Sequence, residues 1–269
     1  MLSNAGRYSH GHHESVLRSH QWRTAENSAG FLLGYLTPGQ DLLDVGCGPG
    51  TITLDLAQRV APGRTVGIDL SPDVIATARQ NQNSSVETNV VFDVGSAYDL
   101  KFADSRFDVV YAHQVLQHLH NPVAALEEMR RVLRVGGLLA VRDSDYGAFT
   151  WAPEDPRLDR WMQIYQQLTK KNNANANAGR VLPTWIRQAG FESMDVSSST
   201  WTFHRPDERL WWGQLWADRV RMSEFAHQSL EYKLTTQQEL TDIAEAFLTW
   251  AANDDGLFIV VHVDVIARR

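Results

Sequence analysis

The sequence predicts an α/β fold: a doubly wound sheet of seven strands, mostly parallel with the last strand antiparallel, and helices on both faces. Two observations predict it. Apolar strand-like segments and helical segments alternate five times within about 110 residues, and right-handed crossovers lay such helices over both sides of a parallel sheet. The strand segments also read apolar throughout, as expected where both faces are covered.

Capping and turn residues set the limits of the predicted elements. Thr24 is a suitable N-cap for the first predicted helix. Ser71 followed by Pro72 is a strong helix start, because it combines a cap with a proline at the first helical position. Asn121 followed by Pro122 repeats this signal. Strands are expected at 41–46, 65–70, 89–94, 107–113, 138–144, 194–203 and 257–269, and helices at 25–36, 51–60, 72–81, 123–133 and 180–191.

Length, charge and cysteine usage exclude several classes of protein. The 269 residues suffice for one large domain with a full core. No apolar run approaches the roughly 20 residues of a membrane span, and no secretory signal is recognisable, so we expect a cytoplasmic protein without a membrane span. The single cysteine fits a reducing compartment. A net charge of −7 with scattered Lys and Arg argues against nucleic acid and for a small-molecule partner; the oligomeric state stays open.

A glycine-rich stretch, LLDVGCGPGT, marks the candidate ligand site. Gly46, Gly48 and Gly50 follow a predicted strand and open a predicted helix. Such a loop lets the backbone turn tightly and approach a ligand where a side chain would collide. Asp69 ends the next strand about 20 residues later, where a carboxylate accepts hydrogen bonds from a ribose diol. The pattern therefore indicates a nucleotide-like ligand.

The residues within and before the loop favour a cationic nucleoside over a pyrophosphate. The dinucleotide fingerprint would place a glycine at Thr51. Pro49 removes an N–H that a pyrophosphate could use, and Asp44 would repel a phosphate but suit an ammonium or sulfonium. An NAD-dependent oxidoreductase remains the alternative that these residues disfavour.

Four motifs in order resemble those of class I S-adenosylmethionine-dependent methyltransferases: LLDVGCGPGTITLDLA, VGIDLS, FDVVYAHQVLQHL and EEMRRVLRVGGLLAV. The resemblance runs from Leu17 to Phe191, more loosely to the end, and is greatest to the small-molecule branch with the menaquinone and ubiquinone enzymes. The stretch SHQWRTAENSAGFLL also resembles the first helix of secondary-metabolite methyltransferases. The resemblance implies a Rossmann-like fold and transfer of a methyl group to an O, S, N or C atom of a small acceptor, with S-adenosylhomocysteine as product.

The resemblance also implies roles for individual residues. The family's Gly-Asp-Ala after the third strand is Gly95-Ser96-Ala97 here, so Ser96 and the backbone of Ala97 would contact the adenine. The N-terminal segment is expected to be a flexible cover in which Tyr8, Trp22 and Arg23 close over the cofactor, with Arg23 either pairing with its carboxylate or standing as a solvated arginine. The remaining implied contacts are Asp44, Gly46, Cys47 and Gly48 around the methionine portion, Asp69 on the ribose, Leu70 on the adenine, and His113 and Gln114 facing the methyl donor.

The sequence pattern also suggests how the chain is divided. Between the last two predicted strands, 207–225 and 236–252 have helical periodicity, which indicates a helical insertion. The expected organisation is an N-terminal cover and first helix at 1–36, a cofactor-binding domain at 37–205 and 256–269, and at 206–255 an insertion forming part of the acceptor cap.

His113 is the candidate general base, since a neutral imidazole deprotonates a hydroxyl or thiol near neutral pH; a histidine that only lines the pocket is the alternative. A protein that binds the cofactor without catalysis is also open. Cys47 has no base nearby in sequence and is expected not to take part in the chemistry.

No metal is expected. The N-terminal histidines lack a zinc-binding spacing, His118 and His120 are assigned to the approach to a helix, and Asp143, Asp145 and Tyr146 are candidate acceptor contacts.

Overall fold

A computed structural model describes residues 22–85 and 88–269. Tyr8 and the histidines His10, His12, His13 and His20 therefore lie outside the described residues. The strands are β1 (Leu42–Val45), β2 (Thr65–Asp69), β3 (Val90–Val94), β4 (Phe107–His113), β5 (Leu133–Ser144), β6 (Thr150–Ala152), β7 (Ser193–Phe203) and β8 (Leu257–Arg268).

These strands form one sheet in the order β3-β2-β1-β4-β5-β8-β6. Strands β5 and β6 pair with different parts of β8, and β7 pairs with β8 along the edge opposite to them. The first five strands are parallel, whereas β8 runs antiparallel to β5, β6 and β7. The predicted doubly wound, mostly parallel sheet is confirmed. It has eight strands rather than seven, because the three residues of β6 are too few to show a strand pattern.

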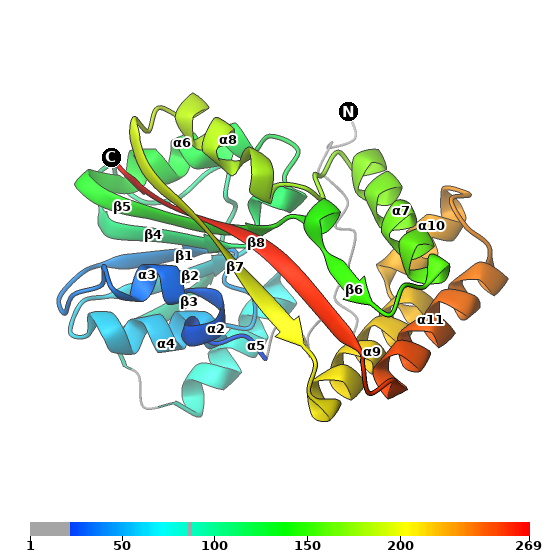
Figure 1. Ribbon diagram of the computed structural model, residues 1–269. Coiled ribbons are helices and arrows are strands. Elements are labelled where there is room, and N and C mark those ends of the chain that lie inside the picture. Colours follow the sequence, from blue (N-terminus) through cyan, green and yellow to red (C-terminus); the bar gives the residue numbers. More distant parts are fainter. Residues whose placement is uncertain (1–21, 86–87) are drawn as a thin grey trace.

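Helices cover both faces of the sheet (Figure 1). Side chains of α6 and α8 share one core cluster with β4 and β5, and those of α2 and α4 share another with β1 and β4. The helices are α2 (Ala25–Ser28), α3 (Gly30–Leu33), α4 (Thr51–Val60), α5 (Pro72–Asn83), α6 (Pro122–Val132), α7 (Pro156–Lys171), α8 (Leu182–Gln188), α9 (Pro206–Met222), α10 (Glu224–Glu231) and α11 (Gln237–Ala252); short 3₁₀ turns η1 (Leu116–His118), η2 (Tyr146–Ala148) and η3 (Gly179–Val181) complete the chain.

The predicted caps form. The side-chain oxygen of Ser71 accepts a hydrogen bond from Val74 N at 3.4 Å, and that of Asn121 accepts one from Ala124 N at 3.2 Å. Three boundaries were wrong. The first predicted helix is two short helices with a break at Ala29, β5 begins at Leu133 rather than at 138, and α8 is shorter than 180–191. Strand β5 begins earlier than predicted because Leu133 already pairs with Phe107 of β4, before the apolar run that starts at Leu138.

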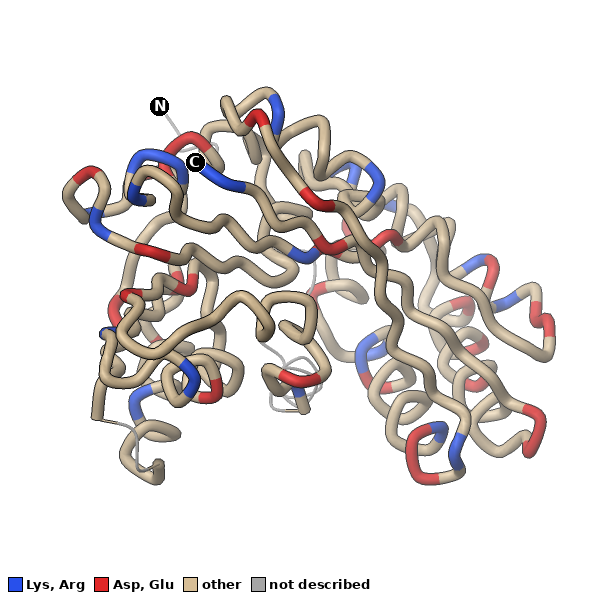
Figure 2. The backbone as a smooth tube through the Cα atoms, turned by 60° about the vertical axis from the view of Figure 1, so that its left-hand side comes forward, with Lys and Arg blue, Asp and Glu red and all other residues tan. Residues whose placement is uncertain are grey.

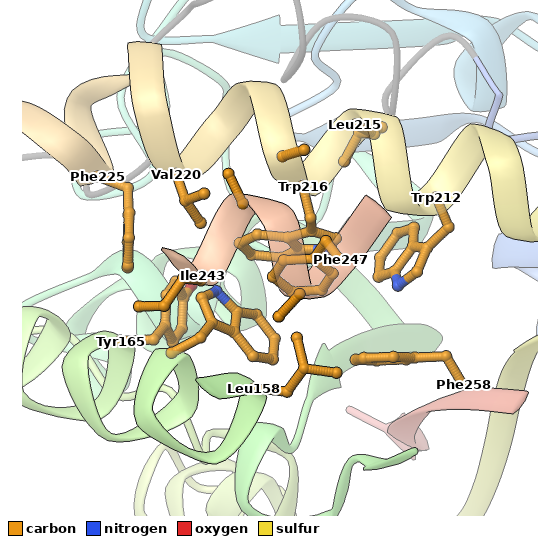
Figure 3. Packing of buried hydrophobic residues seen from close by; sticks show 14 of the residues in the cluster. Leu158, Tyr165, Trp212, Leu215, Trp216, Val220, Phe225, Ile243, Phe247 and Phe258 are labelled. Carbon is orange, nitrogen blue, oxygen red and sulfur yellow. The ribbon is translucent and has the colours of Figure 1, made fainter. Parts of the chain in front are cut away.

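A second core lies beyond the carboxyl ends of the parallel strands. There the long hairpin of β7 and β8 leaves the main sheet and meets α7, α9, α10 and α11 (Figure 1). Helix α7 was not predicted, although Leu158, Trp161, Tyr165 and Leu168 give it an apolar face. Figure 3 shows Trp212 and Trp216 of α9 packed near Phe247 of α11 and Phe258 of β8.

Charged residues of both signs are interspersed over the sheet and the helical layer (Figure 2). Within residues 22–85 and 88–269, no helix combines the length and the apolar character that crossing a membrane requires.

Candidate functional site

The loop between β1 and α4 requires glycine. Gly46, Gly48 and Gly50 have φ angles of +75°, +57° and +82°, in the left-handed region that disfavours other residues. A Cβ on Gly50 would lie 2.6 Å from the Phe92 ring, and one on Gly46 would lie 2.4 Å from a methyl of Val115. The backbone of Gly50 therefore packs directly against the Phe92 ring, and that of Gly46 packs against Val115, which follows β4.

A cavity of about 480 Å³ opens beside this loop at the carboxyl ends of the parallel strands. Open α/β sheets bind ligands at this edge. Every candidate cofactor residue within the described part of the chain lines the cavity, although the strands that carry them are far apart in sequence; these residues are Arg23, Asp44, Gly46, Cys47, Gly48, Asp69, Leu70, Ser96, Ala97, His113 and Gln114.

Asp69 is fixed at the mouth of the cavity by two backbone amides. Its Oδ2 accepts a hydrogen bond from Gly48 N at 3.2 Å, and its Oδ1 accepts one from Ser71 N at 3.0 Å. Each carboxylate oxygen keeps further acceptor capacity. Leu70 beside it is 71% exposed, so its side chain has an open face toward a ligand. Ser96, across the cavity mouth, accepts a hydrogen bond from Tyr98 N at 3.2 Å through its hydroxyl oxygen.

Asp44 and Cys47 lie deeper. The Asp44 carboxyl accepts a hydrogen bond from Thr53 Oγ1 at 2.6 Å. Burial raises the pKa of Asp44 to about 7, with the charge of Asp69 acting in the same direction and the Thr53 hydrogen bond opposing it. Burial, together with both acids, also raises the pKa of the Cys47 thiol well above its usual value. The protonated thiol is a poor nucleophile, since the thiolate is the reactive form.

A series of hydrogen-bonded polar side chains lines the cavity at the ends of β4 and β5. Arg23 donates from Nη2 to Gln114 Oε1 at 2.7 Å, and the Gln114 amide lies 2.8 Å from Ser144 Oγ and 2.9 Å from His262 Nε2. The ring of His113 lies between Tyr111, Trp201 and His262, with centroids 5.8–6.4 Å away. His113 thus lines the cavity in a mostly aromatic part of its wall.

This geometry matches what the comparisons with known proteins show. Residues 36–243 match the family described as a methyltransferase domain. The chain belongs to this methyltransferase family. It is 32% identical to an uncharacterized methyltransferase of Schizosaccharomyces pombe, over 97% of this chain and 96% of the relative. It is 29% identical to a probable methyltransferase of Aspergillus luteorubrus, over 97% of each chain.

Solved structures share the fold of this methyltransferase at low sequence identity. A putative methyltransferase of Bacillus halodurans has a TM-score of 0.57 at 21% identity and covers 88% of this chain and 96% of its own. The YcgJ protein of a Bacillus species has a TM-score of 0.60 at 19% identity, covering 91% of this chain and 98% of its own. The resemblance to S-adenosylmethionine-dependent methyltransferases is confirmed, and with it the cofactor.

The cavity fits this cofactor. The glycine loop lines it with backbone that carries no side chain at Gly46 and Gly48, Asp44 is a buried acid beside that loop, and the Asp69 carboxylate is held by backbone amides and keeps further acceptor capacity. These are the groups that a cationic nucleoside with a ribose diol requires.

The far half of the cavity is built largely from residues that sequence reasoning did not assign. The residues that line this half are Tyr146, Phe149, Trp201, Trp212, Trp216, Arg219 and Val260. The sequence of α9 carries no recognisable pocket motif. The sequence does not reveal this half, because it forms only after folding, when β8 pairs with β5 and with β7 and α9 contacts β7.

Two candidate acceptor contacts, Asp143 and Asp145, are not among the residues that line the cavity. Asp143 is fully buried and accepts a hydrogen bond from Gln117 N at 3.2 Å; burial raises its pKa to about 8. Asp145 forms a paired ion contact with Arg180, so neither acid lines the cavity. His118 ends η1 on the approach to α6, as predicted, and it also lines the cavity, where burial lowers its pKa to about 3. In residues 22–85 and 88–269 no three His, Cys, Asp or Glu residues gather as a metal site.

Proposed function

We propose that this protein transfers the sulfonium methyl group of S-adenosylmethionine to a small organic molecule. The observation that carries the proposal is one continuous cavity, which joins the glycine loop and Asp69 to a chamber under the helical layer. The end of β4 lies between them in the sheet order, because β4 neighbours both β1 and β5. Two reactants held there would meet at His113 and Gln114.

The residues that would hold the cofactor follow from this placement. Asp69 would accept both ribose hydroxyls, Leu70 would pack on the adenine, and Asp44 would face positive charge near Gly46. Ser96 and the backbone of Ala97 would contact the adenine edge. The remaining proposed contacts are Cys47, Gly48 and Gln114, together with Arg23 toward the cofactor carboxylate and Tyr8 in the N-terminal cover.

When bound, S-adenosylmethionine supplies an electrophilic methyl group, and its transfer leaves a neutral thioether. The protein aligns the acceptor atom with that methyl group and excludes water, which is worth up to about 7–11 kcal/mol. His113 would take the proton of a hydroxyl or thiol acceptor, and an acceptor without such a proton needs no base. Two curated relatives, from Penicillium expansum and Aspergillus sclerotiorum, are named O-methyltransferases at 32% and 33% identity over part of the chain.

The proposed domain division follows the same logic. Residues 37–205 and 256–269 would bind the cofactor, 206–255 would form part of the acceptor cap, and 1–36 would cover the site. The acceptor is taken as a small molecule rather than nucleic acid.

Titration calorimetry with S-adenosylmethionine, S-adenosylhomocysteine and NADH tests the ligand. We expect both adenosyl ligands to bind and NADH not to bind. Incubation with a methyl-labelled donor and a panel of phenols, thiols and amines then tests the reaction. Binding of NADH alone would overturn the proposal in favour of an oxidoreductase. Cofactor binding without label transfer to any acceptor would favour a non-catalytic protein that binds the cofactor.

A further inference from the structure

The cavity wall contains buried polar atoms that no hydrogen bond among the described residues satisfies. Oε1 of Gln117 is one of them, and Nε1 of Trp212 is another. Both residues line the cavity, and they are only 3% and 5% exposed. A buried acceptor or donor without a partner costs free energy, and such groups normally meet water or a ligand. These atoms are therefore candidates for contacts with the molecule that receives the methyl group.

Gln117 is held in place by its backbone and by its amide nitrogen. Its backbone N donates to Asp143 Oδ1 at 3.2 Å, and its backbone O accepts a hydrogen bond from Asn175 N at 2.8 Å. The side-chain Nε2 lies 3.0 Å from Nε2 of His118. Burial lowers the pKa of His118 to about 3, so its imidazole is neutral and accepts this bond. The amide nitrogen of Gln117 is thus engaged, and the amide oxygen remains for a ligand.

Trp212 offers an N–H rather than a ring face. Its ring stacks on Phe203 with centroids 4.3 Å apart and planes 10° apart. The rings of Trp216 and Phe258 stand at steep angles to it, with centroids 6.0 and 5.7 Å away. These neighbours occupy the surroundings of the indole and fix its orientation. Because an indole nitrogen is a donor only, the contribution of Trp212 to recognition is one N–H in a fixed position.

The two atoms differ in kind and belong to different parts of the fold. Oε1 of Gln117 is an acceptor on η1, which follows β4 of the main sheet, whereas Nε1 of Trp212 is a donor on α9 of the helical layer. A molecule with only one matching group leaves the other atom buried without a partner. A molecule that carries both a donor and an acceptor satisfies both atoms.

We propose that the methyl-accepting molecule carries a hydroxyl and a carbonyl group on one framework, with the hydroxyl donating to Gln117 Oε1 and the carbonyl oxygen accepting from Trp212 Nε1. The proposal rests on the proposed function, since it names the substrate class of that same site. It assigns Gln117 and Trp212 as residues that determine specificity. The amide oxygen of Gln117 accepts a hydrogen bond without taking up the proton, so Gln117 is not a second base beside His113.

Binding of ring compounds of matched size to the S-adenosylhomocysteine-loaded protein tests this at pH 6.5, where their hydroxyl groups are neutral. The compounds with both groups are 5-, 6- and 7-hydroxy-1-tetralone, which differ in the separation of the hydroxyl from the carbonyl. 1-Tetralone keeps only the carbonyl, and 5,6,7,8-tetrahydro-2-naphthol keeps only the hydroxyl. Equilibrium dialysis measures each affinity. We expect at least one hydroxytetralone to bind about fivefold or more tightly than either single-group compound, as one additional neutral hydrogen bond allows.

Single substitutions assign each preference to its residue. Gln117→Leu should reduce the preference for the hydroxyl to less than about twofold and keep the preference for the carbonyl. Trp212→Phe keeps a ring but removes the N–H, and it should do the reverse. A loss of packing alone would weaken all probes together and leave both preferences. Trp211→Phe is the matched control and should change neither preference, because Trp211 is the neighbour of Trp212 on α9 and is not among the residues that line the cavity.

The inference is overturned if no hydroxytetralone binds more tightly than the single-group compounds, if Gln117→Leu or Trp212→Phe keeps both preferences, or if none of the probes binds the loaded protein. The wild-type comparison of the probes decides the substrate class even where a variant does not fold. Calorimetry with S-adenosylhomocysteine shows whether each variant is folded. Failure of S-adenosylhomocysteine to bind the wild type would instead contradict the proposed function, so the two failures are distinguishable.

Discussion

Two acids near the glycine loop differ in their surroundings, and this difference sets what each can do. Asp69 is half-buried and held by backbone amides at the mouth of the cavity. Asp44 is 2% exposed and bonded to a hydroxyl, and its pKa is raised to about 7 mainly by burial. Asp69 is thus suited to a neutral diol, and Asp44 to a ligand whose positive charge can restore its ionised form.

The affinity for S-adenosylmethionine should rise between pH 6 and 7.5. In the unliganded protein the Asp44 carboxyl, with a pKa of about 7, is mostly protonated at pH 6. A bound cation favours the carboxylate, so binding releases a proton and is about tenfold weaker one pH unit below that pKa. Calorimetry in buffers of different ionisation enthalpy measures the affinity and the proton release. Asp44→Asn should abolish the pH dependence and the surface variant Asp73→Asn should keep it; a flat wild-type profile would contradict the assignment.

Asp69→Ala should lower the affinity for S-adenosylhomocysteine by about 10²-fold or more, because hydrogen bonds to a charged acceptor contribute about 1.5–3 kcal/mol each. Calorimetry measures the loss. Asp93→Ala removes an exposed acid at the end of β3, paired with Arg79, and should bind as the wild type does. Unchanged affinity in Asp69→Ala would remove that residue from the cofactor site.

Cys47→Ser should leave the affinity for S-adenosylhomocysteine within about threefold of the wild type. The thiol makes one long hydrogen bond to a backbone carbonyl, and such a weak bond contributes little free energy. That contact is 3.6 Å from Sγ to Gly48 O. Calorimetry and labelled methyl transfer measure the effect. A loss of label transfer with cofactor binding intact would show that the thiol takes part in the chemistry.

At the scale of elements, the contact between α9 and α11 holds the chamber wall in place. Gly213 of α9 faces α11 so closely that a Cβ on it would lie 2.5 Å from Ala251 Cβ and 2.7 Å from Phe247 O. Trp212 and Trp216 flank this point on the same helix and reach into the cavity. The close approach of the two helices thus positions Trp212, whose N–H we assign to the acceptor.

Gly213→Ala should destabilise the protein by about 1–3 kcal/mol, because the added methyl has no space and one neighbour is rigid backbone. Denaturant unfolding followed by tryptophan fluorescence measures this. Gly30→Ala is the matched control: its Cβ would meet nothing within 4 Å, so the change should be neutral or stabilising by up to about 1 kcal/mol. Equal stability of the two variants would show that α9 and α11 separate without cost.

At the scale of the whole molecule, β8 joins the two cores. One part of it pairs with β5 in the main sheet, another pairs with β6, and its residues Phe258 to Arg268 pair with β7. Arg142 of β5 and Asp264 of β8 stand opposite each other in this register, both 2% exposed, with Nε and Oδ1 3.4 Å apart. Arg142 also donates to Asn27 O at 2.8 Å, which ties the first helix to the sheet.

Asp264→Ala should destabilise the protein by about 3–5 kcal/mol, because it leaves the buried Arg142 charge uncompensated. Thermal and denaturant unfolding measure the change. Asp195→Ala, at an exposed position on β7, should stay within about 0.5 kcal/mol of the wild type. The pair Arg142→Met with Asp264→Leu should recover much of the loss, and a silent Asp264→Ala would refute the ion pair as a structural link.

The sequence could predict the fold and the cofactor half of the cavity because their signals are local. A cap such as Ser71 acts within its own first turn, and the glycines act within one loop. Asp69 is recognised by its short distance along the chain from that loop. Sequence reasoning could not show that Asp143 is buried under η1 rather than in contact with a ligand. A buried structural acid and a ligand-binding acid at the end of a strand have the same sequence pattern.

By itself the sequence determined the alternation of strands and helices in the parallel half, the glycine loop and the acids that point to S-adenosylmethionine, because neighbouring residues decide each of these. Only the tertiary structure decided the chamber. Tyr146 of η2 is separated by a long stretch of chain from Trp212 and Arg219 of α9, and the antiparallel pairing of β8 with β5 and β7 brings the two segments to one cavity. Burial, which depends on the whole fold, also decided that Asp44 titrates near neutral pH.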